Sequence, residues 1–256
     1  MKLVGFIQLS KLSEKLKAYI EKLERETSRP ALIKSVQDVW LYGTGGVFKL
    51  DPEYILVDII EDKYLDFKGE VEQEEIEYMI AHEVTHGLLA YKEKYCQFRF
   101  RGRMYNELVV KSASLLFTMV EDIVVSKIIY ENNFQQYPQI YIPQIEYEIE
   151  CARIGEDAYK PYTPLKFKYR YMVFRYILVW GLLKYIKLDE IGRKKSYEYL
   201  EMFKKSYPKQ YAEAKKIKEI ILENDIFTPE GFCNAIKKCL DLNFWNLTNL
   251  VEIYYC

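Results

Sequence analysis

Two histidines and a glutamate in one short stretch carry the clearest chemical signal of this chain. Residues 81–87 read AHEVTHG, and His82 and His86 are the only two histidines among the 256 residues. In a helix, residues four positions apart lie on one face, so both imidazoles can reach one metal ion. Glu83 lies at the edge of that face, where its carboxylate can reach a water on the metal. The spacing therefore predicts metal-assisted hydrolysis. The alternative is a helix whose histidines face solvent or a polar neighbour without a metal.

A long helix has to position these residues. Four glutamates between residues 70 and 75 enrich its first turns in negative charge, where the helix dipole favours it. Apolar residues then cover most of its circumference as far as about Tyr91. This pattern predicts a helix that is buried deep in the domain.

A second helix, expected at about residues 104–131, holds the best candidates for a third metal ligand. It is apolar nearly all round between residues 113 and 129, yet it contains the adjacent carboxylates Glu121 and Asp122. Burying two carboxylates is costly unless they are paired, hydrogen-bonded or bound to metal. A catalytic zinc takes three protein ligands and leaves one position open. A structural salt-bridge pair is the alternative role for the two acids.

With these residues the sequence resembles the zincin metallopeptidases, and within them the gluzincins, over roughly residues 36–131. Gluzincins carry the same His-Glu-x-x-His on their active-site helix and take a glutamate from a later helix as third ligand. The resemblance implies a Zn²⁺ site made by His82, His86 and Glu121, with Asp122 either supporting a ligand or replacing Glu121. The gluzincin Asn-Glu-x-x-x-Asp is absent here, and no third histidine completes a metzincin site. The same donor set would also suit Mn, Fe, Co or Ni.

The activity that this resemblance implies is hydrolysis of a peptide bond. Glu83 would act as general base towards the attacking water and then protonate the leaving amine. A peptide or protein substrate would lie along an edge strand, for which residues 54–60 are the candidate. The competing interpretation is a non-catalytic zinc-binding protein in which the metal ties two helices together.

The rest of the chain predicts a mainly helical α+β fold. A helix is expected at residues 10–29, followed by a small antiparallel sheet within residues 36–60 whose hairpin turn is the GTGG of residues 43–46. A Pro- and Tyr-rich connector at 132–164, which can carry one short helix at about residues 147–153, separates a zincin-like catalytic lobe, 1–135, from a helical C-terminal lobe, 136–256. The second lobe is expected to contain helices at 165–186, 188–207, 210–223, 229–240 and 244–255.

Composition bears on partners and compartment. The net charge is −1, which argues against nucleic acid as a partner, although residues 97–103 and 166–171 alternate arginines or lysines with aromatics. The N-terminus lacks the features of a signal peptide, and the apolar run 171–186 is interrupted by charges. We therefore expect a cytoplasmic protein without a membrane partner. The abundance of Lys, Glu, Ile and Tyr hints at a thermophilic source. The oligomeric state does not follow from the sequence.

Overall fold

The computed structural model describes residues 2–4, 12–36, 45–64, 68, 72–101, 106–134 and 137–255. Contacts between Cα atoms divide the chain into two compact units. The first is Met1–Lys94 with Ile128–Tyr137, and the second is Tyr95–Lys127 with Pro138–Cys256. The lobes expected from the sequence, 1–135 and 136–256, placed residues 95–127 with the first part of the chain, whereas the contacts group them with the second.

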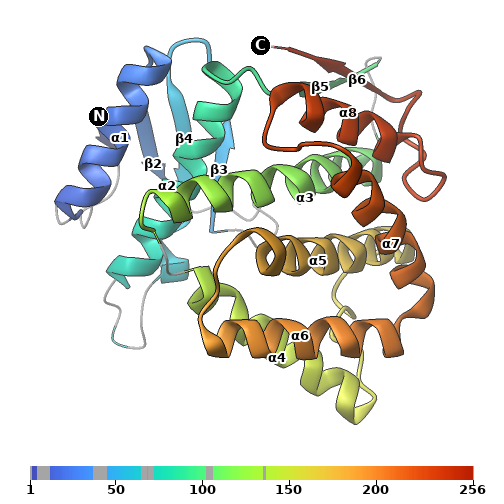
Figure 1. Cartoon of the computed structure of the whole chain (residues 1–256). Helices are drawn as coiled ribbons and strands as arrows, with labels where there is room; N and C mark the ends of the chain where they lie inside the picture. The colour runs from blue at the N-terminus through green and yellow to red at the C-terminus, as the bar shows by residue number, and fades with distance from the viewer. Residues whose placement is uncertain are drawn as a thin grey trace. The chain divides into compact units, whose positions relative to one another are not determined.

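The first unit contains a four-stranded sheet in the order β1-β2-β4-β3 (Figure 1). Its strands are β1 (Lys2–Val4), β2 (Ala31–Ser35), β3 (Gly46–Lys49) and β4 (Ile55–Ile59). The pairs β1–β2 and β2–β4 are parallel, and only β3–β4 is antiparallel. Helix α1 (Glu14–Thr27) connects β1 to β2, and a short 3-10 helix, η2 (Glu61–Tyr64), follows β4.

The antiparallel pairing expected within residues 36–60 is confirmed for β3 and β4, whereas the parallel pairs with β1 and β2 extend the sheet beyond that prediction. A helix between two neighbouring strands returns the chain to the same end of the sheet, so β1 and β2 run parallel. The strand Ala31–Ser35 was not expected at all. Residues 37–44, which include the first half of the expected GTGG turn, lie outside the described part of the chain.

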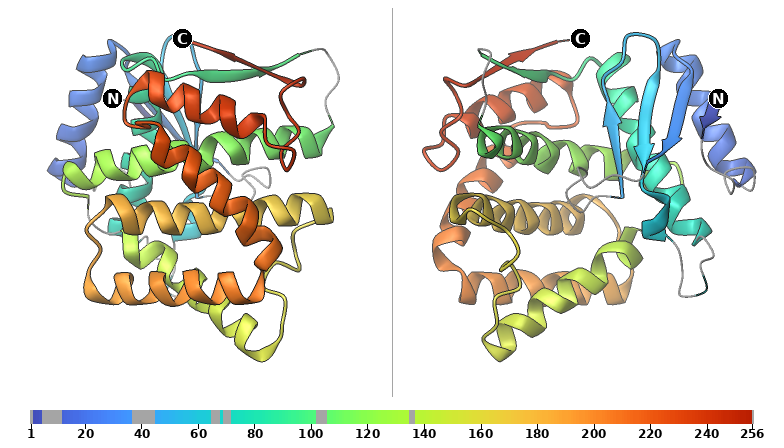
Figure 2. Two further views of the ribbon diagram at one scale, coloured as in Figure 1. Left: turned by 45° about the vertical axis from the view of Figure 1, so that its right-hand side comes forward. Right: turned by 180° about the vertical axis from the view of Figure 1, so that it is seen from behind.

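Helix α2 (Gln73–Tyr91) carries the His-Glu-x-x-His stretch and is buried on almost every side. It packs on β3 and β4, and α1 packs beside it (Figure 2). Helix α1 begins at Ser13, whose hydroxyl accepts a hydrogen bond from the Leu16 amide, and it buries one apolar face. The helix predicted at residues 10–29 and the buried helix ending at about Tyr91 are confirmed.

Close packing of α2 on the sheet depends on Gly87, the residue that follows His86. A Cβ atom built at Gly87 would lie 2.6 Å from Cγ2 of Ile55 on β4. Real Cβ atoms do not approach another carbon so closely, and the β-branched Ile55 has little rotamer freedom to move away. The absence of a side chain at residue 87 therefore sets how near the histidine-bearing turn comes to the sheet.

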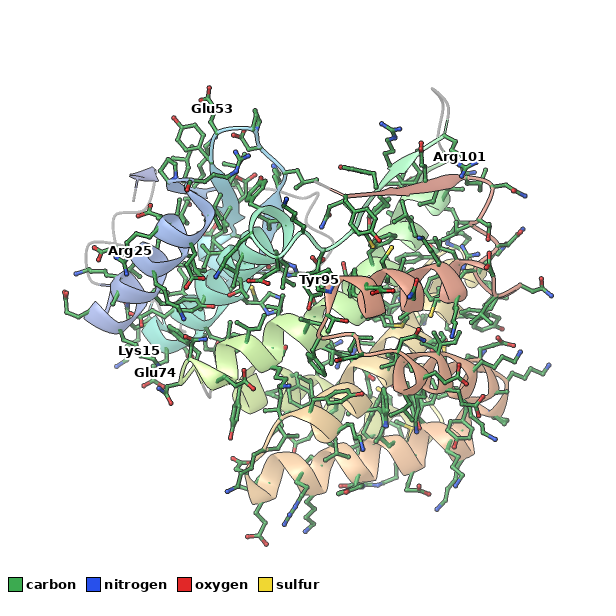
Figure 3. All side chains as sticks on the ribbon, turned by 45° about the horizontal axis from the view of Figure 1, so that its top comes forward. Lys15, Arg25, Glu53, Glu74, Tyr95 and Arg101 are labelled. Carbon is green, nitrogen blue, oxygen red and sulfur yellow. The ribbon has the colours of Figure 1, made fainter. Side chains whose placement is uncertain are left out.

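We expect Gly87→Ala to lower the free energy of unfolding by about 1–2 kcal/mol. Overpacking costs about 1–3 kcal/mol, and the better helix propensity of Ala recovers only part of it. Urea unfolding measures the difference. Glu74→Ala is the control, because Glu74 is exposed in the first turn of the same helix and should change stability by about 0.5 kcal/mol or less (Figure 3). A Gly87→Ala protein as stable as the wild type would contradict the packing argument.

The second unit is mainly helical. Four expected helices are confirmed, and the expected helix at 104–131 begins slightly later than predicted. The helix within the connector is longer than expected, and the expected final helix was wrong. The helices are α3 (Glu107–Glu131), α4 (Tyr137–Ile154), α5 (Leu165–Tyr185), α6 (Glu190–Ser206), α7 (Pro208–Glu223) and α8 (Pro229–Leu240). The last four residues of α3 belong to the first unit. Together with the first unit, these helices confirm the predominantly helical α+β class.

Two segments of the second unit differ from expectation. The expected connector contains the 18-residue helix α4, which continues through Pro143. The expected final helix is instead a strand, β6 (Val251–Tyr254), which pairs antiparallel with β5 (Gln97–Phe100). The paired residues are more than 150 positions apart in the chain, so no local sequence pattern indicates the pairing.

A buried polar network joins α4, α5 and α6. The Glu148 carboxylate accepts hydrogen bonds from Arg175 Nε at 3.1 Å and from the Tyr159 hydroxyl at 2.6 Å. The Tyr199 hydroxyl lies 3.1 Å from that of Tyr159. Because both charges are buried, they need these partners to offset the loss of water. None of the helices in the described ranges combines the length and apolar character needed to cross a membrane.

Candidate metal centre

His82 and His86 lie next to each other on one face of α2, as their spacing predicts. Their Nε2 atoms are 3.2 Å apart, and the ring centroids are 5.0 Å apart. Both side chains are buried, with 7% and 8% of their surface exposed. Two neutral imidazoles at this distance can share a hydrogen bond or bind one ion between them. The arrangement therefore offers two nitrogen ligands on a rigid helix.

Glu83 points towards strand β3. Its Oε2 accepts a hydrogen bond of 2.8 Å from the backbone N–H of Phe48, and 7% of the residue is exposed. Gly46, two residues earlier on β3, makes room for this side chain. A Cβ atom there would lie 2.9 Å from Cγ of Glu83 and 2.6 Å from Cδ1 of Ile59. The carboxylate is thus held at the border between α2 and the end strand of the sheet.

Aromatic rings flank both imidazoles. The Phe48 ring lies nearly parallel to the His86 ring, with 12° between the planes and 6.3 Å between the centroids. The Tyr78 ring, one turn before His82, lies 6.3 Å from the His82 ring. Ring centroids at 4.5–7 Å are in the range of favourable aromatic contacts. No motif in the sequence pointed to Phe48, because its place beside His86 depends on where β3 packs against α2.

Helix α1 contacts α2 through a pair of buried hydroxyl groups. The hydroxyl groups of Tyr19 and Thr85 are 2.7 Å apart, and the Thr85 hydroxyl donates a hydrogen bond to the Ala81 carbonyl. Thr85 precedes His86 directly. Burial raises the pKa of Tyr19 to about 12, and this outweighs the hydrogen bond with Thr85, which lowers it. The contact joins α1 to the turn of α2 that carries the second histidine.

This shift makes stability depend on pH. An unfolded tyrosine ionises near pH 10, so above that pH the unfolded chain loses a proton that folded Tyr19 keeps. The stabilisation is complete below pH 10 and is lost as the pH rises towards 12. Between pH 9 and 11 we expect the wild type to lose about 1 kcal/mol more than Tyr19→Phe. Urea unfolding at both pH values measures these losses. Tyr197→Phe, at an exposed position of α6, is the control and should lose as much stability as the wild type. Equal losses in all three proteins would refute it.

The two acidic residues of α3 face different directions. Adjacent residues on a helix project about 100° apart, so Glu121 and Asp122 do not share a face. Glu121 lies near Cys96, since its charge contributes, together with burial and the neighbouring Cys233 thiol, to raising the pKa of Cys96. Both acids are partly buried. Glu121 therefore lies near the thiol of Cys96, in its own unit.

The expected substrate strand, residues 54–60, was assigned wrongly. Strand β4 lies between β2 and β3, so the backbone groups on both of its sides are already used in pairing. Strand β3 ends the sheet on the side where Glu83 meets Phe48. Of the strands described, β3 is therefore the one beside the motif that can accept an extended chain.

The two arginine- and aromatic-containing stretches serve the fold where they are described. Arg99 pairs with Glu252 at 3.0 Å, and Lys168 forms an ion pair with Asp157. Arg170 is buried and donates to the Phe244 carbonyl at 3.1 Å. Residues 102–105 of the first stretch lie outside the described part of the chain. Arginine and lysine side chains that form these bonds within the protein have fewer N–H groups available to contact nucleic-acid phosphates.

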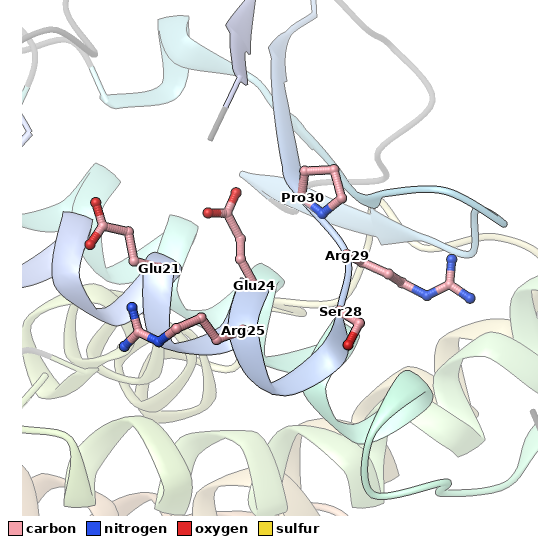
Figure 4. Close-up of a pocket in the computed structure, with 6 residues that line it drawn as sticks. All are labelled: Glu21, Glu24, Arg25, Ser28, Arg29 and Pro30. Atoms are coloured by element: carbon pink, nitrogen blue, oxygen red, sulfur yellow. The ribbon is translucent and has the colours of Figure 1, made fainter.

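A hollow of about 340 Å³ lies at the C-terminal end of α1 (Figure 4). Two of its charged side chains stabilise the fold. Glu24 accepts a hydrogen bond of 2.7 Å from the Ala31 amide, and the Arg29 guanidinium lies 4.2 Å from the centroid of the Tyr91 ring. No residue of the motif is among those that line it, which are Glu21, Glu24, Arg25, Ser28, Arg29 and Pro30.

No family model, curated protein or solved structure matches the chain. The likeness to gluzincins therefore rests on the residues of the motif and on the later acidic pair.

Proposed function

We propose that the protein is a zinc-dependent metallopeptidase whose metal is held by His82 and His86. The observation that carries this proposal is the distance of 3.2 Å between their Nε2 atoms. Two nitrogens bound to one tetrahedral Zn²⁺ at 2.0–2.1 Å are about 3.3 Å apart. The two side chains thus already have the separation that a shared ion requires.

A carboxylate of α3 is proposed as the third ligand. The resemblance to gluzincins favours Glu121, yet Glu121 lies near the Cys96 thiol and projects about 100° away from Asp122. We therefore assign the role to Asp122, the neighbouring carboxylate that the sequence offers as the alternative ligand. Two histidines and a carboxylate are a common ligand set of catalytic zinc.

The roles of the protein side chains follow from their chemistry. Bound zinc would supply a Lewis acid that lowers the pKa of water and polarises a carbonyl group. Glu83 would take the proton of the attacking water as general base and pass it to the leaving amine. Its carboxylate is kept beside the histidines by the Phe48 amide. The outer edge of β3, the end strand of the described sheet, would align the peptide substrate.

The choice of third ligand can be tested with two variants of neighbouring residues. We expect Asp122→Asn to weaken zinc binding by about 100-fold or more, since even changes to groups behind the ligands cost 10–100-fold. Glu121→Gln should bind zinc within about threefold of the wild type. Competition with a chromophoric chelator measures both affinities. The reverse pattern would assign the ligand to Glu121, and two unchanged affinities would exclude both.

The activity itself is tested with a peptide library. Zinc-loaded protein should cleave peptides and lose this activity with a chelator, and added zinc should restore it. Mass spectrometry of the products identifies the cleaved bonds. Zinc binding without any cleavage would instead support the non-catalytic zinc protein.

A further inference from the structure

Strand β3 contacts two of the three motif residues through one residue, Phe48. Its backbone N–H donates to Oε2 of Glu83 at 2.8 Å. Its ring stacks on the ring of His86 at 6.3 Å and 12°. One residue of the sheet thus touches both the proposed base and one proposed metal ligand.

The Phe48 amide can serve Glu83 because it points away from the rest of the sheet. Phe48 lies opposite Val57 of β4, and in an antiparallel pair every second residue directs its N–H and C=O outward. The bond to Glu83 shows that Phe48 is one of these residues. Removing this N–H would therefore leave the hydrogen bonds between β3 and β4 in place.

The position of Phe48 is itself fixed by contacts within the same unit. Its ring meets the Tyr91 ring edge to face, at 5.9 Å and 75°. The Tyr91 hydroxyl donates to the Asp51 carbonyl at 2.9 Å and accepts from the Asp51 amide at 2.8 Å. The last turn of α2 and the turn between β3 and β4 therefore hold the ring that lies on His86.

We propose that Phe48 is a positioning residue that orients Glu83 through its backbone N–H and His86 through its ring. This inference rests on the proposed peptidase function. A carboxylate that accepts an N–H bond is confined to a narrower set of rotamers, and an imidazole stacked on a ring resists rotation. Both effects prepare the site before substrate arrives.

Three variants at residue 48 separate the two contacts. Phe48→Leu removes the ring and keeps the N–H, Phe48→Pro removes both, and Phe48→Tyr keeps both. We expect Phe48→Leu to bind zinc about tenfold more weakly, and Phe48→Tyr to match the wild type. Phe48→Pro should bind zinc as Phe48→Leu does, but with kcat about tenfold lower and an unchanged KM. Leu50→Pro, at an exposed position directly after the end of β3, controls for the effect of a proline close to the site.

The results that would overturn the proposal are distinct. Equal kcat for Phe48→Pro and Phe48→Leu would show that the Phe48 N–H does not position Glu83. Wild-type zinc affinity in Phe48→Leu would show that the Phe48 ring does not position His86. A lower melting temperature in Phe48→Pro than in Leu50→Pro, matching its loss of activity, would reduce Phe48 to a structural residue.

An experiment without catalysis separates this inference from the proposed function. Amide hydrogen exchange followed by NMR on zinc-free protein should show a protected Phe48 amide in the wild type and at least tenfold faster exchange in Glu83→Ala. Unchanged exchange would refute the contact. If the wild type cleaves no peptide, the peptidase proposal fails, while the exchange rates still decide whether Phe48 holds Glu83.

Discussion

Glu83→Gln is expected to lower kcat for peptide cleavage by about 100- to 10,000-fold while the zinc content stays at the wild-type value. Glutamine has nearly the same size and keeps an oxygen that can accept the Phe48 N–H, so the local geometry should persist. It cannot take a proton from water, however, and the general base is lost. Steady-state kinetics with a cleaved peptide and elemental analysis of the same sample measure the two quantities.

The matched control for this substitution is Glu74→Gln. Glu74 lies on the same helix but is exposed in its first turn, so the variant should keep wild-type kcat and zinc content. Undiminished turnover by Glu83→Gln would show that another group acts as the base. Loss of zinc together with activity would instead indicate that Glu83 holds the metal site together.

His82→Ala and His86→Ala are each expected to abolish zinc binding, whereas the wild type should bind about one zinc per chain. The chain has no third histidine that could replace either one. A metal that binds only the folded state at 100 times its Kd stabilises that state by about 2.7 kcal/mol. For a chain of this size this raises the melting temperature by roughly 5–10 °C. Zinc should therefore raise the melting temperature of the wild type and leave both variants unchanged.

Tyr78→Phe is the control for the two histidine variants. It keeps the ring that lies beside His82 and removes only a hydroxyl group, so it should bind zinc as the wild type does. Protein purified without added metal or a histidine tag is needed, because a tag would bind zinc by itself. Wild-type zinc affinity in both histidine variants would leave the motif without a metal role. Zinc loss in only one variant would show that the imidazoles act separately.

The helices that carry the site could be predicted because helix formation is local. Each backbone bond of a helix joins residues four positions apart, and the apolar pattern of a helix is complete within its own segment. For this reason α2, α3 and the four helices from α5 to α8 were found within a few residues. The adjacency of His82 and His86 follows from the same helical geometry and from nothing else.

The pairing of strands depended on the tertiary structure. Strand β2 owes its place to a helix that brings the chain back beside β1, and β6 pairs with a segment more than 150 residues away. The sequence of a short strand does not indicate which strand it pairs with, because the backbone hydrogen bonds that stabilise it come from another segment. The same reason explains the wrong choice of residues 54–60 as the edge strand.

The sequence by itself determined which residues could bind a metal and activate water: two histidines and a glutamate on one turn of a buried helix. Only the tertiary structure decided what surrounds them. Phe48 reaches Glu83 and His86, and Gly46 and Gly87 allow the close approach, because β3 and β4 pack against α2. Such contacts join residues that are 30 to 40 positions apart. The packing of a sheet on a helix creates them, and no spacing along the chain encodes them.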